Sequence, residues 1–289
     1  MIDELLLPFQ LPFMVNAFLV TAIIGVPTAL LSCYLVLKGW SLIGDAISHA
    51  VLPGIVLAYI ASIPLIIGAF VSGMICALAT GFIADNSRVK RDTVMGVVFA
   101  GMFGFGLVLY TQAETDLHLD HILFGNMLGV GQDDLWTAGL IGLLVSSLIL
   151  LRWRDLLVHA FDETHARAIA LPVNLFHYGL LSAISLTIVA TLSAVGIIMA
   201  IGLLIAPGAI AFLVTREFGK MLTVAVLLNL IGGFLGVYAS FFIDSAPAPT
   251  IILLLTMVFI VVFIWREIRN ARAVSSATVH VGNERLDDV

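Results

Sequence analysis

Long apolar runs separated by short polar segments dominate the chain. About twenty consecutive apolar residues are needed for a helix to cross a bilayer. The pattern predicts nine such helices, at about 13–37, 42–61, 64–84, 93–112, 134–151, 174–194, 196–214, 220–243 and 249–265. The expected fold is therefore an all-α, polytopic membrane bundle with eight or nine spans.

Two segments depart from a simple alternation of spans and loops. Residues 193–196 would form a very tight turn between two spans, and a broken helix would also fit. Residues 121–132 are too short to span and too apolar for an ordinary loop, so we expect a short helix or a re-entrant segment packed against protein or a water-filled cavity. We expect a transmembrane domain over 1–272 and a polar, disordered cytoplasmic tail over 273–289.

Composition agrees with a membrane protein and excludes most other classes. Hydrophobic residues make up 61% and charged residues 11% of the 289 positions, well outside the usual mix of soluble domains. No nucleic-acid partner is expected. The two cysteines, Cys33 and Cys76, lie within apolar runs and are too few for a disulfide framework or a four-cysteine metal site.

The distribution of basic residues predicts the orientation, because Lys and Arg favour the cytoplasmic side. All of them can face the cytoplasm together only if the N-terminus is outside and the C-terminus inside. They are Lys38, Arg88, Lys90, Arg91, Arg152, Arg154, Arg167, Arg216, Lys220, Arg266, Arg269, Arg272 and Arg285. The outer segments then carry only acidic charges, which concentrate cations; these are Glu114, Asp116, Asp120, Asp133, Asp134 and Asp244.

Asp45 and His49 are the first candidates for a functional site. They lie four residues apart in the second apolar run, so a helix places them on one face. Ionisable groups inside a membrane are costly and usually face a protein interior or an aqueous path. The structural alternative is that the two side chains only bond to each other or to a neighbouring helix.

Pro53 follows His49 by four residues and has no N–H to donate to the carbonyl of His49. The second span should therefore bend or open there, next to Gly54. A carboxylate, an imidazole and a released carbonyl suit Mn²⁺, Fe²⁺ or Zn²⁺ better than Cu⁺. A two-fold dimer would double this set of ligands, and a transport site needs an affinity low enough for the ion to leave.

The remaining candidates are weaker. A group around the outer connection after the fourth span could capture a cation or meet a delivery protein, or it could be a solvated loop; it comprises Glu114, Asp116, His118, Asp120 and His121. His177 fits an interfacial or packed histidine better than a metal ligand. Pro207 should loosen the seventh span near Leu203, which would serve either gating or packing.

The longest inner connection is the segment 152–172. Asp162 can cap a short helix that carries Ala166 and Ala170 on one small-residue face. Such a helix could dock in the groove of a soluble partner or lie on the membrane surface. The chain has neither a phosphate-binding loop nor an H-E-x-x-H motif, so any ATPase must be a separate polypeptide and an intramembrane metalloprotease is not expected.

The segment 35–54 reads Leu-Val-Leu-Lys-Gly-Trp-Ser-Leu-Ile-Gly-Asp-Ala-Ile-Ser-His-Ala-Val-Leu-Pro-Gly. It resembles the second-span signature of permeases from metal-ion ABC importers. The resemblance is nearest to the manganese/iron permeases, and the zinc permeases come second. Segments 122–126, 161–167 and 206–209 resemble the same family in the expected order. The resemblance thus extends over nearly the whole membrane region.

The resemblance implies a bacterial inner-membrane permease without a permanently bound cofactor. It implies a second permease subunit, two cytoplasmic ATP-binding subunits and an extracytoplasmic metal-binding protein. Asp45 and His49 would line the ion path, with Pro53 and Pro207 as gating candidates. The helix that docks on the ATPase would correspond to 161–170, with Phe161, Asp162, Glu163, Ala166 and Ala170; the family often has glycine where this chain has Ala170.

The sequence therefore predicts an ATP-driven importer of Mn²⁺ or Fe²⁺, with Zn²⁺ as an alternative. A secondary transporter or channel would instead work without an ATPase. A membrane hydrolase that uses Asp45 and His49 around a metal is disfavoured, because no nucleophile or third ligand lies at a recognisable spacing. The choice of metal, and of homo- or heterodimer, stays open.

Overall fold

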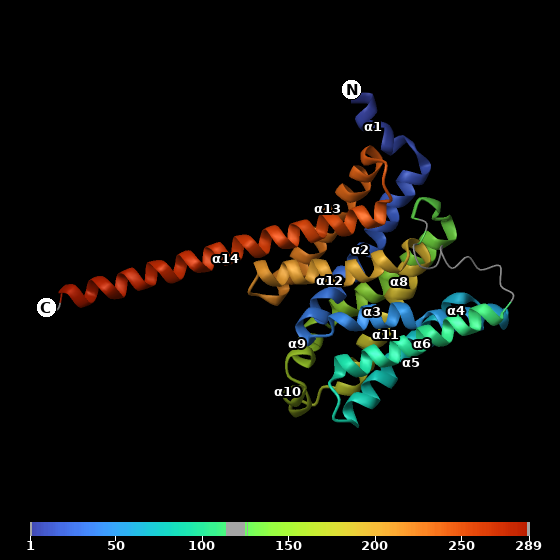
Figure 1. The fold of residues 1–289 in the computed structure, drawn as a ribbon, viewed down its shortest axis with the longest axis horizontal. Helices are drawn as coiled ribbons and strands as arrows, with labels where there is room; N and C mark the ends of the chain where they lie inside the picture. The colour runs from blue at the N-terminus through green and yellow to red at the C-terminus, as the bar shows by residue number, and fades with distance from the viewer. Residues whose placement is uncertain (1, 114–124, 126, 288–289) are drawn as a thin grey trace.

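The computed structural model describes residues 2–113, 125 and 127–287, and within these residues the regular structure is entirely helical. Figure 1 shows the arrangement of the helices. In chain order they are α1 (Ile2–Gln10), α2 (Pro12–Lys38), α3 (Ser41–Ala50), α4 (Leu52–Ile60), α5 (Leu65–Asp85), α6 (Arg91–Gln112), the 3₁₀ turn η1 (Met127–Gly129), α8 (Gln132–Leu151), α9 (Trp153–Phe161), α10 (Glu163–Ala168), α11 (Val173–Val195), α12 (Ile197–Val214), α13 (Phe218–Ile243) and α14 (Pro247–Asp287).

Nine segments in the described part of the chain are long and apolar enough to cross a membrane. They agree with the nine predicted runs to within a few residues, and α3 with α4 forms the second of them. The predicted all-α membrane bundle is therefore confirmed. Length and hydropathy determined this result, because a lipid-exposed backbone must satisfy its hydrogen bonds within each helix.

Local sequence signals set the ends of α2. Pro12 stands in its first turn, where the missing N–H costs no hydrogen bond. Gly39 ends the helix in the left-handed conformation, with φ 66°. The amide of Gly39 donates to Val36 O at 3.2 Å and that of Trp40 to Leu35 O at 2.7 Å. This glycine-dependent cap leaves only two residues, Gly39 and Trp40, between α2 and α3.

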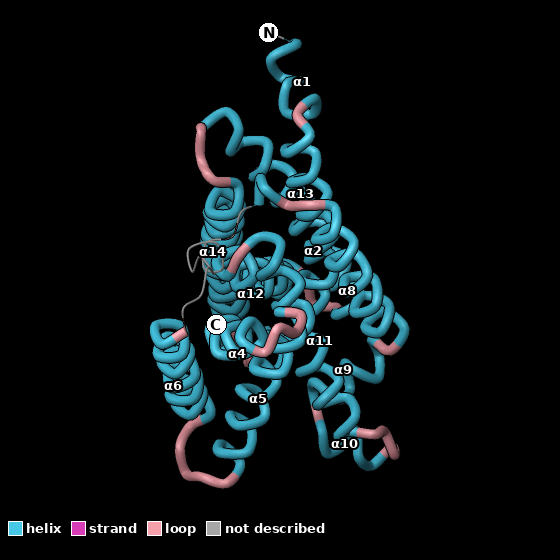
Figure 2. Tube along the Cα trace, turned by 90° about the vertical axis from the view of Figure 1, so that its right-hand side faces the viewer, coloured by secondary structure: helices cyan, strands magenta, loops and turns pink. Residues whose placement is uncertain are grey.

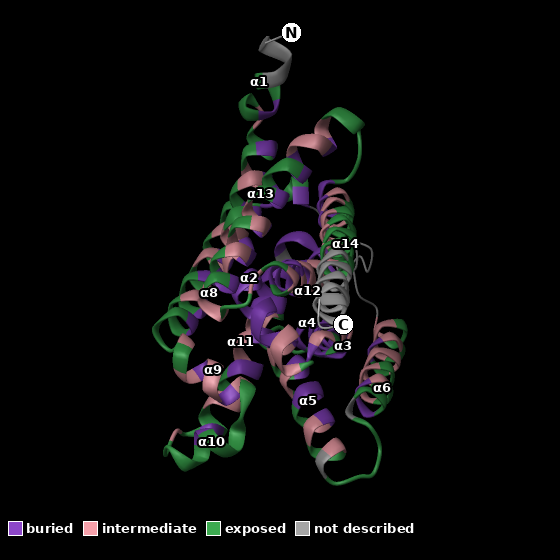
Figure 3. Ribbon diagram, turned by 90° about the vertical axis from the view of Figure 1, so that its left-hand side faces the viewer, coloured by how far each residue is buried: buried purple, intermediate pink, exposed green. Residues whose placement is uncertain are grey.

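α2 is the central helix of the bundle and packs against α8, α12 and α13. Asn229 of α13 is buried and donates to the carbonyl of Gly25 at 2.8 Å and to the hydroxyl of Thr28 at 3.1 Å. Such bonds help to hold membrane helices together. Figure 3 shows buried residues gathered on α2, with more exposed surface on α6 and α8.

The connections after odd-numbered spans share one end of the molecule. Figure 2 shows the α5–α6 loop and α10 at the end opposite to the N-terminus. Since nine spans alternate in direction, the α2–α3 turn, the segment 152–172 and the α12–α13 turn fall on that same side. The predicted grouping of basic residues fits this arrangement. Which side is cytoplasmic stays a prediction.

The uncertain boundary near 193–196 is a break of one residue. Gly196, with φ 86°, separates α11 from α12, a conformation that side chains with a Cβ rarely adopt. In the segment 121–132, residues 121–124 and 126 lie outside the described residues. Its described part contains η1, so its re-entrant character stays a prediction.

The last helix, α14, extends well beyond the bundle (Figure 1). Its membrane-spanning part is Pro247–Ala271, and the helix continues to Asp287. The sequence predicts a disordered tail over 273–289. The predicted domain boundary at 272 stays a prediction.

Candidate metal site and coupling segment

Asp45 and His49 lie on α3, in the first half of the second span. His49 stands eight residues after Ser41, about 12 Å along the axis at 1.5 Å per residue, and thus near the middle of the span. Its Nε2 lies 3.4 Å from Oδ1 of Asp45. The predicted pairing on one helix face is therefore present in the structure.

The pair is neither buried nor fully open. The side chain of His49 is 30% exposed and that of Asp45 35%. Two phenylalanines of α6 flank the imidazole, with ring centroids 5.8 Å away for Phe99 and 5.3 Å for Phe103. One side of the pair is thus enclosed by aromatic rings, and the remaining surface is available to an ion, water or a second chain.

Pro53 divides the second span into α3 and α4. The amide of Val51 donates to Ile47 O and that of Ile55 to Val51 O, both at 3.1 Å, so helical bonding continues on either side of the proline. The proline sits against Gly106 of α6, where an added Cβ would come within 2.8 Å of the Pro53 nitrogen. The predicted opening is therefore a local break held by close packing.

The second predicted gating residue, Pro207, is buried inside α12. The adjacent Gly208 lies directly against α2, where a Cβ would come within 2.5 Å of the backbone of Ser32. This close approach packs α12 against α2 at the residue next to Pro207. A gating role for either proline stays a proposal.

The outer acidic and histidine group is not brought to any described site. Glu114, Asp116, His118, Asp120 and His121 all lie outside the described residues. Their predicted capture of cations stays a prediction. Asp133 and Asp244, which are described, are exposed at the start of α8 and the end of α13.

Asp162 caps α10 as predicted. Its carboxylate accepts the backbone N–H of Thr164 at 2.8 Å and that of His165 at 3.0 Å. These bonds hold the pKa of Asp162 below its usual value, and the bond from the His165 amide has the largest effect. The cap therefore stays ionised at neutral pH and fixes the start of the short helix.

The predicted face shared by Ala166 and Ala170 is wrong, because α10 ends at Ala168. Ala166 is fully buried, whereas Ala170 is exposed and left-handed, with φ 59°. The amide of Leu171 donates to Ala166 O at 3.0 Å and that of Ala170 to Arg167 O at 3.1 Å. This is a Schellman ending whose usual glycine is replaced by Ala170.

Phe161 and Glu163 face different surroundings beside the cap. Phe161 is 80% exposed and lines, with Asp162, a groove of about 580 Å³ between α9 and the start of α13. Glu163 turns toward the bundle, where its Oε1 accepts a hydrogen bond from Lys38 Nζ at 3.0 Å. The segment thus presents one surface outward and is bonded to the end of α2 by the other.

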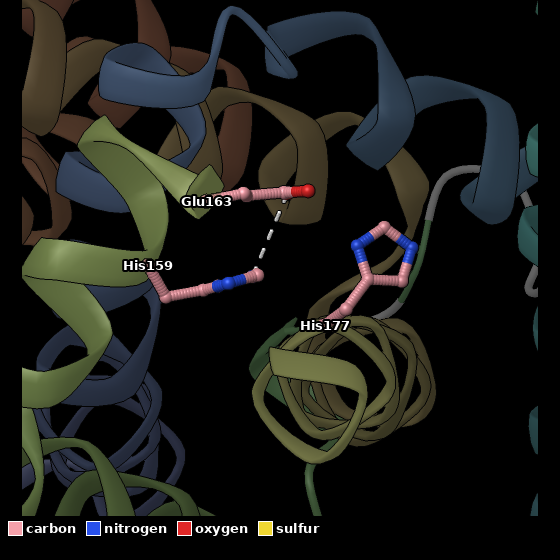
Figure 4. A group of neighbouring side chains, drawn as sticks. All are labelled: His159, Glu163 and His177. Carbon is pink, nitrogen blue, oxygen red and sulfur yellow. Dashed lines mark ion pairs between the residues drawn. The ribbon is translucent and has the colours of Figure 1, made fainter. Parts of the chain in front are cut away.

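The tertiary structure also brings together a group that the sequence spacing does not reveal. His159 of α9, Glu163 of α10 and His177 of α11 place one possible ligand atom each within 4.8 Å of the others (Figure 4). The ring of His177 also lies against that of Trp40, with centroids 5.3 Å apart. The only sequence signal was the i, i+4 spacing of His159 and Glu163.

Comparison with known proteins gives a consistent result. The ABC 3 transport family matches residues 10–266. The chain is 55% identical over 266 residues to the chelated iron transport system membrane protein YfeD of Yersinia pestis, covering 91% of this chain and 88% of that protein. It is 44% identical over 257 residues to the manganese transport system membrane protein MntB of Synechocystis sp., covering 89% and 84%.

A solved structure agrees with these matches. PsaBC from Streptococcus pneumoniae in complex with Fab superposes with a TM-score of 0.82 at 33% identity, covering 91% of this chain and 95% of that one. The family match and the sequence relatives each extend over nearly all the spans described above. The chain belongs to the ABC 3 transport family and is a membrane permease of the metal-ion ABC importer type.

Proposed function

We propose that this permease carries a divalent transition-metal ion, Mn²⁺ or Fe²⁺, into the bacterial cytoplasm by alternating access. The observation that carries the proposal is the Asp45–His49 pair, 3.4 Å apart near the middle of a span and about one-third exposed. A carboxylate with an imidazole suits these ions. The relatives named for iron and manganese transport support the same choice. Zn²⁺ is the alternative by ligand chemistry alone.

Two ligands from one helix leave most of a metal's coordination sphere empty, so a second permease subunit should complete the site. A two-fold arrangement would bring two carboxylates and two imidazoles to one axis. The open side of the pair, away from Phe99 and Phe103, leaves room for such a partner. The ion is cargo and would bind only transiently.

Cytoplasmic ATP-binding subunits would dock at the coupling segment, where Phe161 is exposed beside an open groove. Lys38 then gives a direct path to the metal pair. It bonds Glu163 of the segment and stands three residues before α3 begins. A movement of α10 would therefore act on the helix that carries Asp45 and His49.

On the other side, an extracytoplasmic metal-binding protein would deliver the ion. The exposed carboxylates of Asp133 and Asp244 support an acidic outer surface that attracts cations. Pro53 and Pro207 would allow α4 and α12 to change their packing as access alternates. Each proline lies beside a glycine contact that a rearrangement would have to open.

Uptake by proteoliposomes tests this function. Vesicles would contain this chain, its ATPase, its second permease subunit and its binding protein, with ATP enclosed and radiolabelled Mn²⁺, Fe²⁺ or Zn²⁺ outside. We expect Asp45→Asn and His49→Gln each to reduce uptake by about tenfold or more, because a lost ligand weakens ion binding by more than the ~1.4 kcal/mol that a factor of ten represents. Asp92→Asn, which removes an exposed carboxylate at the start of α6, is the matched control.

Normal uptake by both site variants would contradict the assigned ion path. Uptake by vesicles without the ATPase would instead show a secondary transporter or channel. The preferred metal in the complete system identifies the cargo. Variants would first be checked for assembly with the ATPase, so that loss of transport is separated from loss of the complex.

A further inference from the structure

A group of side chains at the end of the bundle that carries α10 has the composition of a second metal site. His159, Glu163 and His177 come from three consecutive helices and approach one another as Figure 4 shows. Their possible ligand atoms all lie within 4.8 Å. Metal bonds of about 2.0–2.2 Å place neighbouring ligand atoms about 3.0–3.6 Å apart, so these side chains would have to approach one another by about 1 Å to bind an ion.

A cation already occupies the space between two of these residues. The ammonium of Lys38 donates to Glu163 Oε1 at 3.0 Å and lies 3.3 Å from His159 Nε2. It also lies 4.6 Å from the centre of the Trp40 ring. The Lys38 side chain is only 6% exposed. The protein therefore holds its own positive charge where two ligands meet.

The ammonium of Lys38 also lowers the pKa of both neighbours. Burial, together with the charge of Lys38, lowers the pKa of His159 to about 4, so its imidazole is neutral at cytoplasmic pH. Burial alone would raise the pKa of Glu163, but the hydrogen bond and charge of Lys38 offset this and hold the pKa below its usual value. These are the charge states in which both side chains accept hydrogen bonds from Lys38.

A purely structural tie does not explain His159. Since Nε2 accepts from Lys38, the proton of the neutral ring lies on Nδ1, which is buried and has no hydrogen-bond partner among the described residues. An unpaired buried donor costs about 1–3 kcal/mol. The Lys38–Glu163 bond would join the two segments without an imidazole, so the histidine points to a further role.

We propose that His159, Glu163 and His177 form a cytoplasmic site for a divalent transition-metal ion, which competes with the Lys38 ammonium for the same space. Two imidazoles and one carboxylate select ions such as Mn²⁺, Fe²⁺, Co²⁺ or Zn²⁺ over Mg²⁺ and Ca²⁺. Glu163, 45% exposed, provides the open side through which an ion would enter.

The site has a regulatory consequence that rests on the proposed function. A bound ion would displace Lys38 and break its bond to Glu163, which joins α10 to the end of α2. Metal that accumulates in the cytoplasm would thereby weaken the link between the docking segment and the transport helix. Import would slow as the cytoplasmic supply rises.

Binding of Co²⁺ to the detergent-solubilised complex, followed by its visible absorption, tests the site without requiring transport. The Asp45→Asn background removes the transport pair. We expect one Co²⁺ per chain, lost in His159→Ala and in the nearly isosteric Glu163→Gln. Lys38→Met should bind Co²⁺ about tenfold more tightly. The Lys38 ammonium occupies the site in most molecules, and the apparent affinity for the metal falls with the fraction of sites that stay free. His165→Ala, an exposed histidine on α10, is the matched control.

The proposal is overturned if Co²⁺ binds neither to the chain that keeps Lys38 nor to the Lys38→Met variant. It is also overturned if binding survives the loss of His159 and Glu163. Thermal unfolding of each variant verifies that it is folded. If His159→Ala does not fold, Co²⁺ binding by Glu163→Gln tests the site instead. Co²⁺ binding here is independent of uptake. Failure of the Asp45 and His49 uptake test would therefore leave this result standing, and the reverse also holds.

Discussion

At the scale of single residues, Ala170 has a backbone conformation that its side chain disfavours. Its φ of 59° belongs to the left-handed region, which L-residues other than glycine enter at a cost. The two bonds of the Schellman ending, from Ala170 to Arg167 and from Leu171 to Ala166, keep it there. This backbone geometry explains why the family often has glycine near this position.

Ala170→Gly should stabilise the end of α10 by about 1 kcal/mol, since glycine adopts this conformation without steric strain. The amide of Leu171 should then exchange hydrogen about fivefold more slowly, measured by native-state exchange. Ala168→Gly, within the helix, is the control and should speed exchange instead. Equal effects of the two substitutions would show that the conformation at 170 carries no strain.

At the scale of elements, the contact between α4 and α5 depends on two glycines. A Cβ at Gly54 would overlap the carbonyl oxygen of Gly68, and a Cβ at Gly68 would overlap that of Gly54. The two helices therefore touch backbone to backbone. Ser72 of α5 adds a hydrogen bond to the carbonyl of Ala50 at 2.6 Å, one turn before Pro53. This contact fixes α4 relative to the metal pair.

Gly68→Ala should destabilise the permease by about 1–3 kcal/mol or more, because overpacking against a backbone cannot be relieved by a side-chain rotation. Thermal unfolding in detergent would measure this as a lower midpoint. Gly81→Ala is the matched control on the same helix, since a Cβ there meets no atom within 4 Å. A drop of similar size in both variants would rule out the close approach as the cause.

At the scale of the whole molecule, the nine spans found among the described residues place the two ends of the membrane domain on opposite sides. Loops after odd-numbered spans collect the basic residues, and those after even-numbered spans carry exposed acids such as Asp244. The charge distribution therefore predicts that the α5–α6 loop is cytoplasmic and that the α13–α14 loop is outside.

Labelling of single cysteines in intact cells tests this orientation. Ser245→Cys, in the α13–α14 loop, should react with a membrane-impermeant maleimide, whereas Ser87→Cys, in the α5–α6 loop, should react only after permeabilisation. The buried Cys33 and Cys76 would first be replaced by alanine. The opposite labelling pattern would invert the proposed direction of transport and of the coupling segment.

The sequence by itself determined the elements and the local pairs. The nine spans follow from apolar length, and the Asp45–His49 contact follows from a spacing of four on a helix, so neither needs distant contacts. The cap by Asp162 is local for the same reason. The end of α10 was predicted wrongly, because a left-handed alanine carries no sequence signal.

Only the tertiary structure decided what lies next to these elements. Lys38 meets His159 and Glu163 across more than 120 positions, and Phe99 meets His49 across fifty. Apolar periodicity specifies which residues enter a membrane but leaves open which helices become neighbours, because lipid and protein interiors are equally apolar. The close glycine contacts and the buried ammonium select those neighbours, and they exist only once the bundle is packed.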